Sequence, residues 1–314
     1  MNVRVASWIA CSSSILVASC GSSHKTSSSS SPPPDTSPMP SAGCGTGGLK
    51  AGTFQLMYQG VQYGYIVHLP PSYDPKRPAP LVLNWHAYQA NAMGEEGFSN
   101  FDPVGDAKGF VVVYPDSPDQ SWNAGTCCAF TAMNRDDVGF AMALVDSLEQ
   151  TGCIDTRRIF ATGMSNGAFM AYRLGCEHAE TFAAIAPVAG KVGIPNCNPS
   201  RAVPLIEFHG TADNFVPYDS GILSGDNQTV PETVASWAMR DACTDGPTQT
   251  FQNGTVTCQR WSSCKDDATV TLCTAQGEGH CWPGQSYCPI GASTTDVDAS
   301  AVIGDFFTRF SLIR

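Results

Sequence analysis

Ser165 is the residue whose setting most suggests covalent chemistry, because it lies at the centre of a Gly-x-Ser-x-Gly motif at residues 163–167. An apolar run at 159–161 precedes the motif and a helix-like pattern follows it. We therefore expect a strand, a tight turn and a helix in succession. Such a turn strains the backbone and lifts the serine hydroxyl above the sheet. The alternative is a serine in an ordinary glycine-rich turn, so the interpretation depends on partner residues elsewhere.

A serine hydroxyl becomes a good nucleophile only when a base takes its proton, and the usual base is a histidine held by a carboxylate. His280 lies in an irregular loop after the last strand-like run, from which an imidazole can reach over Ser165. The other histidines lie in the N-terminal spacer, inside a strand, at a helix end or at earlier strand ends: His24, His68, His178, His86 and His209. The sequence therefore predicts His280 as the general base.

The carboxylate that orients this histidine is predicted to follow a strand between Ser165 and His280. Asp213 fits, because it comes after the apolar run 203–208 and a glycine turn. Asp226 and Asp241 follow no strand, and Glu278 stands too close to His280 in sequence to be the obvious choice. The resulting chain order of serine, aspartate and histidine is the order of the α/β-hydrolase triad.

Two backbone N–H groups are expected to form an oxyanion hole for the tetrahedral intermediate. The first is that of Asn166, directly after the nucleophile at the start of the predicted helix. The second should come from the loop after the apolar run 81–85, where Tyr88 is the choice and Ala87 the next candidate.

The elements that would position these residues alternate between strands and helices. Short apolar runs predict buried strands, and Asp-rich or amphipathic segments predict helices between them. This pattern implies an α/β fold of the α/β-hydrolase type, with a mostly parallel central sheet covered by helices on both faces. An antiparallel pair at 54–58 and 63–69 precedes the parallel part. The expected parallel strands are 81–85, 110–114, 159–161, 183–188 and 203–208, and the expected helices are 136–148, 233–240 and 301–310.

The N-terminal region is expected to be a leader and a spacer rather than part of the core. Residues 1–19 carry one charge and an apolar stretch at 8–17 that serines interrupt. The segment at 16–20, Leu-Val-Ala-Ser-Cys, resembles a bacterial lipobox. Cleavage before Cys20 would leave a lipid anchor there, and a plain signal peptide is the alternative. Residues 20–43 are rich in serine and proline and predict a disordered tether. Residues 44–314 are then the catalytic domain, and the protein is expected to be exported and held at the cell envelope.

Composition excludes several functions. The net charge of −11 opposes binding to nucleic acid or to an anionic membrane surface. Of the 14 cysteines, two lie in the leader and 12 in the body, an even number that in an exported chain favours disulfides over a metal site. No metal or other cofactor is expected, and the only predicted membrane contact is the lipid on Cys20.

Several segments together resemble the poly(3-hydroxybutyrate) depolymerase/feruloyl esterase family of secreted α/β-hydrolases. They lie at 121–125, 136–140, 162–167, 172–174, 186–190, 209–213 and 279–284. The resemblance covers roughly residues 44–314 and puts Ser165, Asp213 and His280 where the family has its triad. It implies cleavage of hydroxycinnamoyl esters on plant cell-wall polysaccharides, with hydroxyalkanoate polyesters as the alternative substrate. An acyltransferase and a non-catalytic surface binding protein are less favoured interpretations.

Aromatic residues near the predicted site are candidates for contact with the substrate. Trp122 and Trp282 are the predicted substrate-binding residues, and Tyr88 is a further candidate. Their rings could stack on a phenolic group or cover an aliphatic acyl chain, and the alternative is that they belong to the core.

The cysteine pattern is similar to the framework of fungal feruloyl esterases, and it leads us to predict six pairs. Cys258 and Cys264 are separated by a short turn that a bridge between Cys243 and Cys273 would enclose, and Cys281 and Cys288 flank a Pro-Gly turn. The complete set is 258–264, 243–273, 281–288, 176–197, 44–153 and a vicinal bridge, 127–128.

Overall fold

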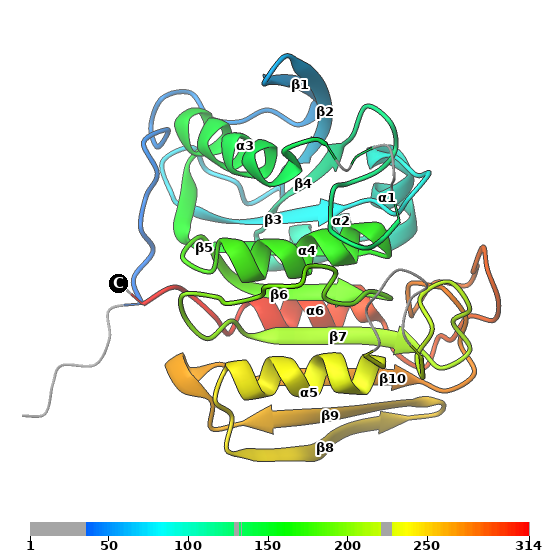
Figure 1. Cartoon of the computed structure of the whole chain (residues 1–314). Coiled ribbons are helices and arrows are strands. Elements are labelled where there is room, and N and C mark those ends of the chain that lie inside the picture. The colour runs from blue at the N-terminus through cyan, green and yellow to red at the C-terminus, as the bar shows by residue number, and fades with distance from the viewer. Residues whose placement is uncertain (1–35, 129–131, 133, 221–227, 314) are drawn as a thin grey trace, which may run out of the picture. The chain divides into compact units, whose positions relative to one another are not determined.

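The computed structural model describes residues 36–128, 132, 134–220 and 228–313. These residues belong to one compact unit, Asp35–Arg314. Its centre is a ten-stranded sheet with the strand order β1-β2-β4-β3-β5-β6-β7-β10-β9-β8 (Figure 1). The six strands from β4 to β10 are parallel, and an antiparallel pair extends the sheet at each edge. The predicted fold class, an α/β-hydrolase with a mostly parallel sheet, is confirmed.

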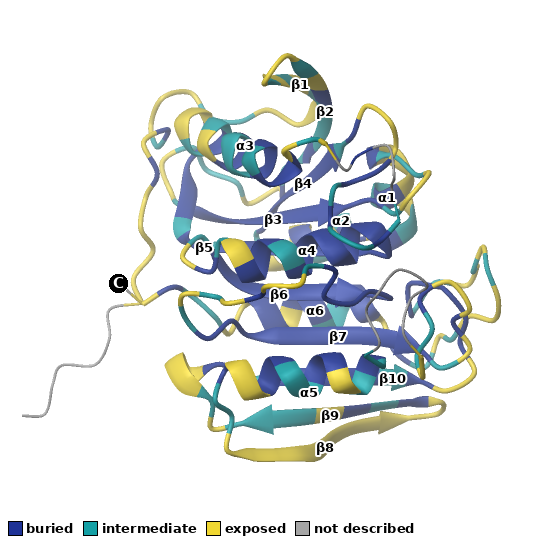
Figure 2. Ribbon diagram, in the orientation of Figure 1, coloured by how far each residue is buried: buried dark blue, intermediate teal, exposed yellow. Residues whose placement is uncertain are grey.

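The central strands agree with the apolar runs of the sequence. The central strands β3 and β6 are buried at every position, because helices cover both faces of the sheet (Figure 2). The strands are β1 (Gly52–Tyr58), β2 (Val61–His68), β3 (Ala79–Trp85), β4 (Val111–Asp116), β5 (Ile154–Met164), β6 (Phe182–Val188), β7 (Leu205–Gly210), β8 (Asp245–Asn253), β9 (Val256–Ser262) and β10 (Val270–Ala275).

The sheet divides the core into two apolar clusters, and helices cover each of them. On one face lie α3 (Asp137–Thr151), α4 (Asn166–Glu177) and α5 (Val230–Arg240) (Figure 1). The other face carries α1 (Ala92–Ser99), α2 (Asp102–Lys108) and α6 (Ala299–Phe307). The sequence pattern does not indicate α1 and α2. Among the described residues, no helix combines the length and apolarity needed to cross a membrane.

The predicted tether, residues 20–43, ends earlier than its composition indicates. The Met39 N–H donates to Asp155 Oδ1 at 2.9 Å, and Ser41 Oγ donates to the Gly152 carbonyl at 2.6 Å. Residues 39–41 therefore belong to the folded body, because they supply hydrogen-bond partners to the start of β5. The predicted leader, residues 1–19, and the predicted anchor at Cys20 lie outside the described residues.

Six disulfides join the cysteines of the described region. Four predicted pairs are confirmed, namely 44–153, 127–128, 176–197 and 281–288. The predicted pairs 258–264 and 243–273 are wrong, since the bridges are 258–273 and 243–264.

The structure gives the physical reason for the wrong pairs. Cys258 and Cys273 are direct cross-strand partners on the antiparallel strands β9 and β10, with Cα atoms 4.0 Å apart. From Cys258 the chain continues as the extended strand β9 to Ser262 instead of turning at once. This extension carries the chain about 13 Å away from Cys258 before Cys264 is reached, which disfavours a bridge between the two.

Candidate active site

Ser165 occupies the sharp turn between β5 and α4, as the motif predicts. Its backbone has φ 54° and ψ −119°, a region that a residue with a side chain rarely adopts. The two motif glycines permit this turn because the end of β3 passes close to it. A Cβ at Gly163 would lie 2.4 Å from the Trp85 carbonyl oxygen, and one at Gly167 only 1.9 Å from it. A side chain at Gly163 on β5 would collide with the end of β3 and with the backbone of Gly167, and one at Gly167 would collide with the end of β3.

Asn166 begins α4 and connects the nucleophile turn to the loop beside it. Its side-chain oxygen accepts from the Trp122 N–H at 2.7 Å, and its Nδ2 donates to the carbonyls of Trp122 and Cys127. The backbone N–H of Asn166 stands in the first turn of the helix, where N–H groups have no intrahelical acceptor. Such a donor next to Ser165 is suited to an oxyanion.

His280 and Asp213 form a buried pair, with His280 Nδ1 2.7 Å from Asp213 Oδ2. The other carboxylate oxygen of Asp213 accepts the backbone N–H groups of Phe215 and Val216. Burial alone would raise the pKa of Asp213, but the hydrogen bonds from His209 and His280 outweigh it and hold that pKa well below its usual value. Asp213 is therefore an anion that fixes the Nδ1 side of His280 and leaves Nε2 available to a reacting group.

A second histidine, His209, contacts the same carboxylate and was missed as a site residue. Its Nε2 lies 3.4 Å from Asp213 Oδ2 and 2.8 Å from the Val216 carbonyl oxygen, and its Nδ1 lies 3.0 Å from Glu207 Oε1. Burial acts to lower the pKa of His209, but hydrogen bonds with Asp213 and Glu207 raise it to about 9. The signal in the sequence was its position at the end of β7, four residues before Asp213.

Ser165 and His280 line the same cavity, which has a volume of about 710 Å³. Most of its walls are apolar or backbone, and its lining includes no lysine or arginine in the part of the chain that the structure describes. Tyr88 and Ala87 lie on this wall as predicted, and the disulfide 127–128 forms part of it. The cavity is also lined by Gln89, Ala90, Gly94, Glu95, Phe98, Thr126, Met164, Phe215, Val216, Pro289 and Ile290.

The two tryptophans predicted to contact substrate lie elsewhere, in the core. Trp122 has no exposed surface, stands edge-on to Trp85 at a centroid distance of 4.8 Å, and donates its Nε1–H to the His86 carbonyl. Trp282 is also fully buried, and its Nε1–H donates to Ser300 Oγ at 2.9 Å. Both indoles support the loops of the site from behind instead of facing the cavity.

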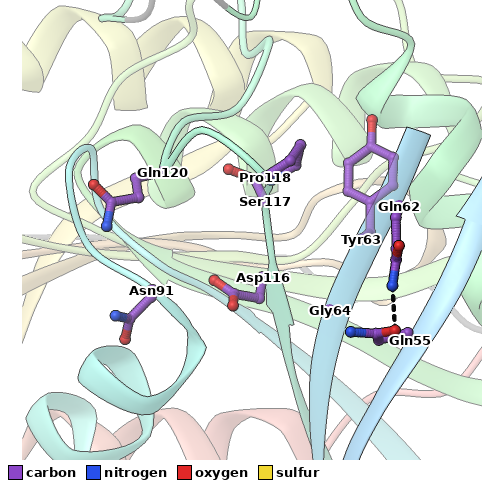
Figure 3. Close-up of a pocket in the computed structure, with 9 residues that line it drawn as sticks. All are labelled: Gln55, Gln62, Tyr63, Gly64, Asn91, Asp116, Ser117, Pro118 and Gln120. Atoms are coloured by element: carbon purple, nitrogen blue, oxygen red, sulfur yellow. Dashed lines mark hydrogen bonds between the residues drawn. The ribbon is translucent and has the colours of Figure 1, made fainter.

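A second cavity, of about 540 Å³, is lined by polar side chains from β1, β2 and the loops beyond β3 and β4 (Figure 3). Gln62 donates to Gln55 there, while Asn91, Asp116 and Gln120 face the same space. Its described lining contains no histidine to activate a nucleophile. The cavity that holds Ser165 and His280 is therefore the candidate active site.

Comparison with known proteins gives matches to esterases. The family model described as "Esterase PHB depolymerase" matches residues 63–203. Feruloyl esterase B of Piromyces equi is 32% identical over 231 residues, which make up 68% of this chain and 42% of that protein. Feruloyl esterase D of Neurospora crassa is 28% identical over 190 residues, 56% of this chain and 63% of that protein. The chain therefore spans less than two thirds of the length of either relative.

A solved structure shares the fold. The acetyl xylan esterase from Aspergillus awamori has a TM-score of 0.56 and 19% sequence identity, over 73% of this chain and 94% of that one. At this identity the similarity concerns the fold alone, and it agrees with the α/β-hydrolase architecture described above.

Proposed function

We propose that this chain, as a member of the PHB depolymerase/feruloyl esterase family, is a serine esterase that cleaves hydroxycinnamoyl esters of plant cell-wall polysaccharides. The observation that carries the proposal is the shared cavity of Ser165 and His280, together with the 2.7 Å contact between His280 and Asp213. Its relatives are named esterases, which agrees with a carboxylic-ester hydrolase.

In the proposed mechanism, Ser165 Oγ attacks the ester carbonyl carbon while His280 Nε2 takes the hydroxyl proton. Asp213 stabilises the imidazolium that forms. The backbone N–H groups of Asn166 and Tyr88 stabilise the oxyanion of the tetrahedral intermediate. Collapse of that intermediate breaks the bond to the alcohol, which receives the proton from His280, and leaves an acyl-Ser165 ester. Water, deprotonated by His280, then releases the acid and regenerates the serine.

The substrate assignment is supported by the cavity and by the relatives. A cavity of about 710 Å³ with mostly apolar walls suits a phenolic acyl group, and two relatives are named feruloyl esterases. A hydroxyalkanoate polyester is the second candidate, because the family model carries that activity in its description.

Kinetics of Ser165→Ala test the proposed catalysis. We expect wild type to hydrolyse methyl ferulate faster than a hydroxybutyrate oligomer. The variant should lose activity by about 10³-fold or more, since the nucleophile is gone while the fold remains. Circular dichroism serves as the control for folding. Equal rates for wild type and variant would contradict the role of Ser165, and a preference for the oligomer would favour the polyester alternative.

We further propose that the protein is exported and held at the cell envelope by a lipid on Cys20. The lipobox-like segment before Cys20 and the disulfide-rich body support this. Cell fractionation of wild type and Cys20→Ala tests it. We expect wild type in the membrane fraction and the variant in the soluble fraction, because the acyl chains are the predicted anchor. An unchanged distribution and an unchanged mature mass would refute lipidation.

A further inference from the structure

A buried carboxyl group in the wall of the active-site cavity has no role in the mechanism above. Glu95 is 2% exposed and lines the cavity that holds Ser165 and His280. Its Oε1 has no hydrogen-bond partner among the described residues. Among the described residues, no lysine or arginine lines the cavity to balance a charge there.

The position of Glu95 follows from the way α1 packs. Residues Ala92, Glu95 and Ser99 form the buried face of this helix. Ser99 Oγ donates to the Glu95 carbonyl at 2.7 Å and accepts from Asn84 Nδ2 at 2.9 Å, which connects α1 to β3. Asn91 caps the start of the helix. The Glu95 side chain is therefore held inward, at a position where an amphipathic helix would ordinarily have an apolar residue.

Burial in this setting favours the neutral form of the carboxyl group. Burial raises the pKa of Glu95 to about 8, and no lysine or arginine of the described cavity lining opposes that effect. A neutral carboxyl group can donate one hydrogen bond and accept others. Leaving a buried polar group unsatisfied is unfavourable, so a ligand that hydrogen-bonds this carboxyl group gains selectivity over one that does not.

We propose that Glu95 is a specificity-determining residue that hydrogen-bonds the phenolic hydroxyl of a 4-hydroxycinnamoyl group. The inference rests on the proposed esterase function, with the ester carbonyl at Ser165 and the acyl group extending along the cavity. A phenolic hydroxyl both donates and accepts, which matches a neutral carboxyl group. The remaining cavity wall, which includes Phe98, Met164 and Ile290, would then contact the ring and the propenyl chain.

Two esters that differ only in this hydroxyl test the proposal: methyl 4-hydroxycinnamate and methyl cinnamate. We expect wild type to favour the hydroxylated ester by about 10- to 100-fold in kcat/KM. Glu95→Leu should reduce this ratio to near one, whereas Glu95→Gln, which still donates and accepts, should retain most of it. Glu96→Leu is the matched control, because its side chain is on the same helix but does not line the cavity.

Binding measurements separate this proposal from the proposed catalysis. In a Ser165→Ala background, calorimetry should give the same preference for the hydroxylated ester, lost in the Ser165→Ala/Glu95→Leu double variant. If wild type hydrolyses neither ester, the catalytic proposal fails, yet the binding ratio still tests Glu95. A ratio unchanged by Glu95→Leu, or an absence of preference in the parent, would overturn the role of Glu95. Thermal unfolding checks that the variants fold, and we expect Glu95→Leu to be at least as stable as wild type.

Discussion

At the scale of single residues, burial separates the aromatic residue that lines the cavity from the two that lie in the core. Tyr88 faces the cavity and is 42% exposed, whereas Trp122 and Trp282 have no exposed surface. Sequence reasoning could place all three near the site because of their positions relative to strand ends and loops. It could not tell which rings face the cavity, because that depends on packing partners such as Trp85 and Ser300 from distant parts of the chain.

Asp241 shows how one buried carboxyl group should affect stability. Its Oδ1 accepts the Val203 N–H at 3.1 Å, while its Oδ2 has no partner among the described residues. Burial raises its pKa from 3.8 to about 7. The folded state therefore binds this proton more tightly than the unfolded state does. The stability that the folded state gains from this tighter proton binding is fully present below pH 3.8 and is lost as the pH rises through about 7.

We expect the melting temperature to fall between pH 5 and pH 8.5 more steeply in wild type than in Asp241→Asn. The variant retains an acceptor for the Val203 N–H but has no charge to bury. Scanning calorimetry at the two pH values measures both slopes. Equal slopes would show that Asp241 does not titrate in the way its burial implies.

At the scale of elements, apolar runs predicted the central strands, and Asp-rich or amphipathic segments predicted helices between them. The predicted runs 81–85, 110–114, 183–188 and 203–208 all lie within or beside β3, β4, β6 and β7. The two short helices α1 and α2 were missed because glycine and acidic residues obscure their periodicity. Without α1, nothing in the sequence indicated that Glu95 lies in the cavity, because the helix is what turns its side chain inward.

Two disulfides should affect different properties of the protein, one its activity and the other its stability. The bridge 281–288 closes a loop with a sequence separation of 7 next to His280, whose N–H donates to the Ile290 carbonyl at 2.9 Å. The bridge 44–153 has a separation of 109 and joins the start of the body to the start of β5. Chain entropy predicts a contribution to stability of about 2.5 kcal/mol for the first and about 5 kcal/mol for the second.

We therefore expect Cys281→Ser/Cys288→Ser to lower kcat/KM by about 10- to 100-fold with a modest loss of stability, because small displacements of His280 impair catalysis. Cys44→Ser/Cys153→Ser should instead lower the melting temperature more and leave kcat near that of wild type. Each double variant is the control for the other, with activity and thermal unfolding measured in parallel. The reverse ranking would contradict the expectation that the 281–288 bridge holds His280 in its catalytic position.

At the scale of the whole molecule, the parallel sheet brings together residues that are far apart in the chain. Ser165 follows β5, Asp213 follows β7, His280 follows β10 and Tyr88 follows β3, so all four lie beyond the carboxyl ends of parallel strands. The chain order of serine, aspartate and histidine was enough to predict this arrangement. The antiparallel β8–β9 extension and its two bridges could not be predicted in the same way, because their register depends on which strands pair across the sheet edge.

Covalent labelling with a fluorophosphonate reagent, followed by intact-mass measurement and peptide mapping, is the most direct test of the central claim. A serine activated by His280 and Asp213 should react once per chain, and the adduct should lie on the peptide that contains Ser165. Ser165→Ala should remain unlabelled under the same conditions. An unlabelled wild-type protein, or an adduct on any residue other than Ser165, would contradict the assignment of Ser165 as the nucleophile of an esterase.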